Sequence, residues 1–174
     1  MEMGSTIRHG RLLGLLENSI LELFFAKKLE HFSESASLVY WGKKKVPKSC
    51  ELVDISAISD IEDFTKSTIN MLGLVTPDYM HFNSNKFIVN DNETIIAGFP
   101  NLIVEIWSKS NVDFDRDFLK YLYSTSDTTE HWYIDQDSNI VECWHGTERI
   151  KDQNLAHILR TQDNVEFDLR YLAL

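Results

Sequence analysis

Two carboxylates are the residues of this chain best suited to chemistry. Glu105 lies in the middle of "LIVEIW", whose other residues are all apolar and are typical of a buried strand. An ionised carboxylate is costly there unless a cation or hydrogen-bond donors accompany it. Asp78, in "TPDYMHF", opens the strand predicted about one hairpin earlier, so neighbouring strands can bring the two carboxylates together. Because Mg²⁺ and Mn²⁺ prefer carboxylate and water oxygens, the pair is predicted to bind one of these ions.

Each carboxylate also has a purely structural interpretation. Glu105 would then be a core residue paired with an arginine, a lysine or backbone amides. The Pro-Asp sequence at Asp78 would only mark the start of a turn or strand.

A lysine near the two carboxylates could position or deprotonate an attacking water. Strand side chains alternate in direction, and the position that shares the face of Glu105 two residues later is Trp107. Lys120 on the following predicted helix is the first alternative, and Lys109 is the second. A lysine on an amphipathic helix is otherwise a solvated surface charge.

The composition excludes several classes of protein. The chain has 174 residues, enough for a core without disulfides, and its two cysteines predict a reducing cytoplasm. Glu17 and Glu22 interrupt the apolar N-terminal segment, so no membrane span is expected. The six histidines show no zinc-binding spacing, and there is no phosphate-binding glycine loop. A formal net charge of −10 disfavours a tight, passive nucleic-acid binder.

The helices and strands that must position these residues are predicted to form one mixed α/β domain over residues 1–174. A frayed start, one long amphipathic helix from Leu12 to about Phe32, and helices over 111–124 and 152–160 are predicted. A further short helix is predicted in "DIEDFTKSTINML". The predicted strands are "SLVYW", "CELVDISAI", "PDYMHFN", "KFIVN", "TIIAGF", "NLIVEIWS", the hairpin formed by "HWYID" and "IVECWHG", and the terminal "VEFDLRYLAL".

Residues 76–135 carry a resemblance to a known family. "TPDYMHF", "GFPNLIVEIWSKSN", the helix with Asp115, Lys120 and Tyr123, and "TEHWYID" resemble the core of the Uma-two family. That family groups endonucleases of the PD-(D/E)xK, restriction-endonuclease-like superfamily. The resemblance implies a mixed central sheet flanked by helices, with a C-terminal hairpin.

The same resemblance implies roles for single residues. Asp78 and Glu105 would be metal ligands, with the carbonyl of Ile106 as a third oxygen. Lys120 would be the catalytic lysine, supplied by the helix instead of the strand. A glutamate on the first helix would complete the site, and Glu17 and Glu22 are equal candidates.

The chain departs from the family pattern at three places. Asn101 replaces an aspartate after Pro100, and Asp127-Thr128 replaces a Gly-Val pair. Lys120 is displaced by one residue, which is a rotation of about 100° on a helix.

The expected function is Mg²⁺- or Mn²⁺-dependent hydrolysis of nucleic-acid phosphodiester bonds, with DNA as the expected substrate. Lys43, Lys44, Lys45 and Lys48 would contact the phosphate backbone or form a solvated turn. Two alternatives stay open. One is a degenerate nuclease fold that binds nucleic acid or protein, and the other is an assembly module that forms a homodimer through its aromatic hairpin.

Overall fold

The computed structural model describes residues 3–26, 29–33, 36–40, 73–83, 87–89, 95–98, 100–107, 113–124 and 130–172. The four-lysine cluster, the strand predicted in "CELVDISAI" and the helix predicted in "DIEDFTKSTINML" lie outside these residues. Within the described part, no helix is both long enough and apolar enough to cross a membrane.

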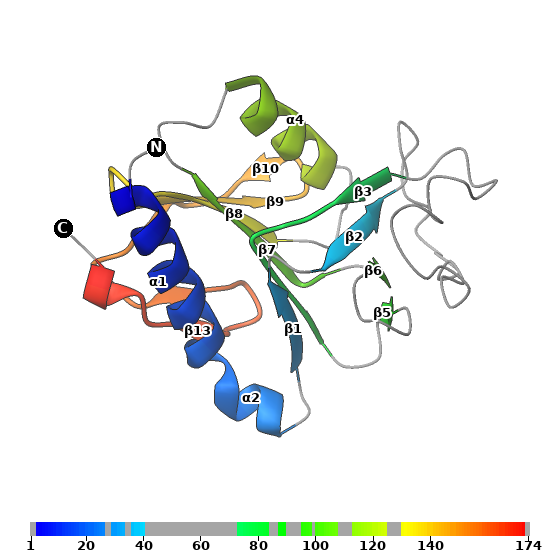
Figure 1. The fold of residues 1–174 in the computed structure, drawn as a ribbon, viewed down its shortest axis with the longest axis horizontal. Coiled ribbons are helices and arrows are strands. Elements are labelled where there is room, and N and C mark those ends of the chain that lie inside the picture. Colours follow the sequence, from blue (N-terminus) through cyan, green and yellow to red (C-terminus); the bar gives the residue numbers. More distant parts are fainter. Residues whose placement is uncertain are drawn as a thin grey trace.

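A mixed sheet forms the centre of the molecule (Figure 1). Its order is β1-β4-β7-β8-β9-β10, and β11 also pairs with β9. The strands are β1 (Leu29–Ser33), β4 (Tyr79–Asn83), β7 (Leu102–Trp107), β8 (Glu130–Asp135), β9 (Ile140–His145), β10 (Glu148–Arg149) and β11 (Gln153–Asn154). Within the described part of this sheet, β7 and β8 are the one parallel pair, and the helix α4 (Asp113–Ser124) lies between them in sequence. The remaining pairs of this sheet are antiparallel, including the predicted hairpin β8–β9.

Smaller elements flank this sheet. A second sheet has the order β3-β2-β6-β5 and a third pairs β12 with β13. Their bounds are β2 (Ser37–Tyr40), β3 (Gly73–Val75), β5 (Phe87–Val89), β6 (Ile95–Gly98), β12 (Leu159–Arg160) and β13 (Glu166–Phe167). This arrangement confirms the prediction of a mixed α/β fold with helices beside a central sheet.

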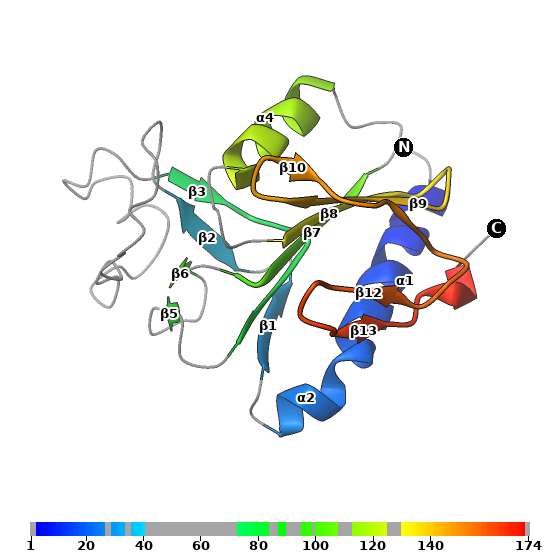
Figure 2. The same cartoon turned by 180° about the vertical axis from the view of Figure 1, so that it is seen from behind.

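The two faces of the central sheet are covered by different helices (Figures 1 and 2). On one side, called the α1 face, Val104, Ile106 and Trp132 pack with leucines of the helix α1 (Met3–Ser19). On the other side, called the α4 face, Trp107 and Tyr133 pack with residues of α4. Because strand side chains alternate, β7 serves both faces, and all six of its residues are buried.

The long N-terminal helix was predicted wrongly. The chain instead forms α1 from Met3, a second helix α2 (Leu21–Phe25), and the strand β1. The helix ends at Ser19, whose hydroxyl donates to the carbonyl of Leu15 at 2.7 Å. That hydroxyl also accepts a bond from the backbone N–H of Asp168. Side-chain hydrogen bonds of this kind compete with the backbone hydrogen bonds of a helix. The helix therefore ends at Ser19, although the spacing of the apolar residues predicts that it continues.

The prediction of a helix over residues 152–160 is also wrong. The segment forms β11 and β12, joined by a loop that side chains close. Gln153 exchanges two hydrogen bonds with the backbone of Arg160, and Asn154 accepts one from the backbone N–H of Ala156. These bonds replace the backbone bonds of a helix. The predicted terminal strand is limited to β13, and a 3₁₀ turn (η1, Arg170–Leu172) follows it.

Candidate active site

Three polar residues lie in a row across the neighbouring strands β7, β8 and β9 on the α4 face, and Asp78 lies beside the first of them. Glu105 of β7 pairs with Tyr133 of β8, which pairs with Glu142 of β9. Asp78 directly precedes β4, whose first residue faces the neighbour of Glu105. The backbone N–H of Ile106 donates to Oδ2 of Asp78 at 2.6 Å, which fixes this carboxylate beside Glu105. We call Asp78, Glu105, Tyr133 and Glu142 the polar row.

Glu105 is a buried acid with an unusual protonation equilibrium. Its side chain lies within the sheet, and the residue is 7% exposed. Burial and, after it, the nearby charge of Asp78 raise its pKa to about 8. The hydroxyl of Tyr123 donates to Oε1 of Glu105 at 2.5 Å and opposes this shift. Without a cation, Glu105 is therefore mostly protonated at neutral pH.

Asp78 is contacted by a residue that the sequence did not single out. Nε2 of His9, on α1, lies 3.4 Å from Oδ1 of Asp78. His9 precedes Leu12 and Leu16 by three and seven residues, so it continues the buried stripe of this helix. The sequence signal that could have identified His9 is its position, as a polar residue, at the end of this apolar stripe.

The two glutamates predicted as alternatives on the first helix belong to different helices, and the choice between them stays a prediction. Glu17 is on α1, where its charge helps burial to raise the pKa of Tyr79, a residue of the α1 face. Glu22 is exposed and belongs to α2. The helical residue that the structure brings to Asp78 is His9.

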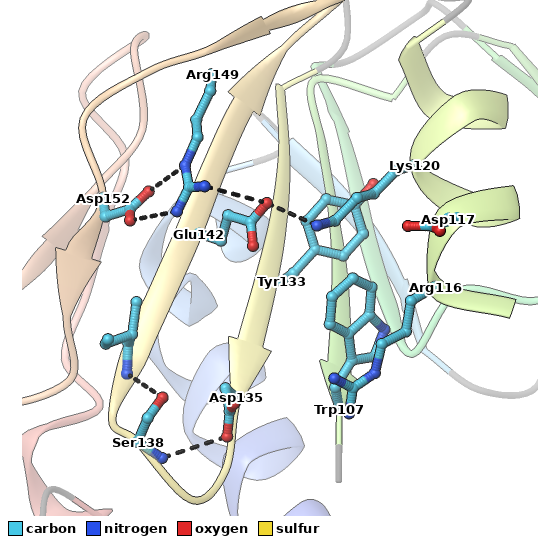
Figure 3. A pocket seen from close by; sticks show the side chains of 11 residues that line it. Trp107, Arg116, Asp117, Lys120, Tyr133, Asp135, Ser138, Glu142, Arg149 and Asp152 are labelled. Carbon is cyan, nitrogen blue, oxygen red and sulfur yellow. Dashed lines mark hydrogen bonds and ion pairs between the residues drawn. The ribbon is translucent and has the colours of Figure 1, made fainter. Parts of the chain in front are cut away.

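Lys120 lies over the opposite end of the polar row (Figure 3). Its Nζ donates to Oε1 of Glu142 at 2.7 Å. The same ammonium lies over the rings of Trp107, Tyr133 and Trp144, at 5.1, 5.4 and 5.8 Å from their centroids. Cation–π attraction and the ion pair therefore hold Lys120 at the hairpin β8–β9. The alternative, Lys109, lies outside the described residues.

The oxygen donors at Asp78 and Glu105 suit a hard cation. Mg²⁺ is commonly held by one or two carboxylates and keeps several waters, and Mn²⁺ accepts similar ligands. In the described part of the chain, no group of three or more His, Cys, Asp and Glu side chains is arranged to hold a metal ion. Asp78 and Glu105 would supply two carboxylates to such an ion, with the carbonyl of Ile106 as the further oxygen implied by the resemblance and water as the remaining ligands.

Comparisons with known proteins agree with the fold. No family model matches the chain, and neither does any curated protein. Among solved structures, the chain is similar to "a putative nuclease belonging to DUF820 from Anabaena variabilis ATCC 29413". The TM-score is 0.64 at 12% sequence identity, over 96% of this chain and 82% of that one. The chain therefore has a nuclease-like fold, which confirms the predicted fold class.

Proposed function

We propose that this chain is a Uma-type, metal-dependent endonuclease that hydrolyses phosphodiester bonds in DNA. The observation that carries the proposal is the carboxylate pair on the α4 face. Asp78 is fixed by the N–H of Ile106 and stands beside the buried Glu105. A buried acid beside a second acid, in a nuclease-like fold, is an arrangement that a divalent cation would stabilise.

The protein groups around the pair have distinct roles in this proposal. A bound Mg²⁺ or Mn²⁺ would polarise the phosphate and lower the pKa of a bound water. Asp78, Glu105 and the carbonyl of Ile106 would hold the ion. The hydroxyl of Tyr123 donates to Glu105 and keeps this carboxylate in one orientation. Lys120, once detached from Glu142, would stabilise negative charge on the phosphate.

A second candidate is a degenerate nuclease fold that binds nucleic acid without cutting it. The contact of Lys120 with Glu142 at 2.7 Å favours this alternative, because the lysine is already paired away from the two carboxylates. The two candidates differ in one measurable property, which is whether cleavage depends on Asp78 and Glu105.

The test is a cleavage assay with supercoiled plasmid, single-stranded DNA and RNA, in Mn²⁺ and in Mg²⁺. We expect the wild type to cut DNA, and Asp78→Asn and Glu105→Gln to lose at least about 100-fold in rate. Arg170→Gln, at an exposed ion pair with Asp168, is the matched control and should cut like the wild type. Cleavage that survives in both carboxylate variants would contradict the proposal. Nucleic-acid binding without cleavage, unchanged in these variants, would establish the degenerate alternative.

A further inference from the structure

A pocket of about 500 Å³ opens at the Tyr133–Glu142 end of the polar row (Figure 3). Trp107 and Tyr133 line it from the sheet, with ring centroids 4.4 Å apart. Three cationic side chains line it as well: Arg116 and Lys120 from α4, and Arg149 from β10. The pocket therefore combines an aromatic wall with cations from two separate elements, at a volume typical of small-ligand sites.

Two of the three cations in this pocket, Arg149 and Lys120, are held in place by carboxylates. Arg149 donates through Nε and Nη2 to the two oxygens of Asp152, at 3.2 and 2.7 Å. Lys120 is held by Glu142, and Arg116 lies 4.9 Å from the centroid of the Trp107 ring. An arginine has five N–H donors and a lysine three, so the bonds to Asp152 and Glu142 orient Arg149 and Lys120 and leave each of them further donors. Oriented donors of this kind suit a phosphate group.

The acidic residues of the pocket have identifiable local roles. Glu142 and Asp152 bond to the cations just described. Oδ1 of Asp135 accepts the backbone N–H groups of Asp137 and Ser138 in the β8–β9 turn. Asp117 is exposed on α4. Glu142 and Asp152 thus orient cations and Asp135 shapes a turn, so an anionic ligand meets prearranged donors.

Two residues that line the pocket are neighbours of Glu105 in the sheet. Trp107 follows Glu105 by two residues on the same face of β7, and Tyr133 is the direct partner of Glu105 on β8. Neighbouring strands are about 4.8 Å apart, so Glu142 lies roughly 10 Å from Glu105 along the row. A ligand in the pocket would lie beside a phosphate held at the carboxylates.

We propose that this pocket binds one nucleotide of the substrate strand through its phosphate group, next to the position of cleavage. Arg149 and Arg116 contact the phosphate, and the wall formed by Trp107 and Tyr133 packs against the sugar and base. The inference rests on the proposed nuclease function, because it assigns the neighbouring nucleotide of the same substrate. The ligand chemistry is a phosphate carried on a nucleoside, and both a free nucleotide and a strand supply it.

The test is isothermal titration calorimetry in EDTA, with thymidine 5′-monophosphate, thymidine and the dinucleotide d(TpT) as ligands. We expect the monophosphate to bind the wild type with a Kd below about 1 mM and thymidine to bind at least about tenfold more weakly. Arg149→Gln should weaken the monophosphate about tenfold. Arg170→Gln is the matched control, because Arg170 has the same exposure and the same two-point bond to an aspartate. It should bind like the wild type.

The outcomes separate the pocket from the catalytic proposal. Equal binding of thymidine and its monophosphate, no binding of either, or wild-type affinity in Arg149→Gln would overturn the pocket assignment. Binding of d(TpT) assigns the pocket to a strand, and binding of the monophosphate alone assigns it to a free nucleotide. Nucleotide binding that persists in a protein without Mn²⁺ binding would retain the pocket and reject the nuclease.

Discussion

Glu105 and Glu130 are two buried acids on neighbouring strands, and their surroundings differ. Glu130, on the α1 face of β8, is 4% exposed and accepts hydrogen bonds on both oxygens. Trp132 donates to Oε1 at 2.6 Å, and the N–H of Gln162 donates to Oε2 at 2.7 Å. Glu105, on the opposite face, is also buried, but after burial the main influence on its pKa is the charge of Asp78. For Glu130, the hydrogen bonds from Gln162 and Trp132 follow burial in their influence on the pKa, and the charge of Asp163 comes after them. The proposed cation site is therefore at Glu105, where the charge of a second acid directly follows burial.

The largest expected difference between the two acids is in the pH dependence of stability. Glu105 has a pKa of about 8 in the folded protein, against about 4.5 when unfolded, so the folded state binds more protons between these values. The free energy of unfolding should therefore fall as pH rises from about 4.5 to about 8, by at most about 5 kcal/mol. Urea titrations of the wild type and Glu105→Gln in EDTA, from pH 5 to 8.5, measure this effect. Parallel pH profiles of the two proteins would contradict the assignment.

Glu130→Ala should give the next largest effect. The substitution leaves the indole N–H of Trp132 and the backbone N–H of Gln162 without their acceptor, at a cost of about 3 kcal/mol in stability. Glu105→Gln at pH 8, where Glu105 is half ionised, should be as stable as the wild type or more so, because the amide carbonyl still accepts from Tyr123. Urea denaturation at one pH compares the two variants. A larger loss of stability in Glu105→Gln than in Glu130→Ala would contradict this prediction.

Tyr123→Phe tests the donor that opposes the pKa shift of Glu105. Removing its hydroxyl should raise the pKa of Glu105 further, since the bond favours the ionised carboxylate. We expect the pH-dependent loss of stability to move to higher pH and the stability at pH 7 to change by about 1 kcal/mol. Tyr121→Phe, an exposed tyrosine on the same helix, is the control and should leave the profile in place.

The smallest effect is expected for Glu142→Gln. The pair of Glu142 with Lys120 is partly exposed, with side chains 19% and 28% accessible, and such pairs contribute about 1 kcal/mol or less. The carboxamide can also still accept from the indole of Trp144. A loss of stability as large as that of Glu130→Ala, measured by the same urea titration, would show that this ion pair stabilises the fold as much as Glu130 does.

The sequence predicted the part of the site that depends on regular strands. The uninterrupted apolar run around Glu105 identified β7, and the alternation after Asp78 identified β4. Because β4 and β7 are neighbouring strands, Asp78 and Glu105 lie close together. The hairpin β8–β9 was predicted for the same reason, since its strands flank the turn "QDSN".

Contacts between distant segments were not predictable in this way. His9 reaches Asp78 across 69 positions, and nothing local to either residue specifies that contact. Lys120 could be assigned to a helix, but its ion pair depends on Glu142, which the hairpin brings to it. The break after Ser19 depends on a bond from Asp168, near the other end of the chain. Tertiary contacts of this kind override local periodicity.

Calorimetric titration of Mn²⁺ at pH 8 tests the carboxylate pair most directly. The proteins to compare are the wild type, Glu105→Gln and Glu130→Gln. We predict saturable binding to the wild type, an affinity at least about 100-fold lower in Glu105→Gln, and wild-type affinity in Glu130→Gln. If the wild type gives no heat of Mn²⁺ binding, or if Glu105→Gln binds Mn²⁺ with wild-type affinity, then Asp78 and Glu105 do not form a metal site.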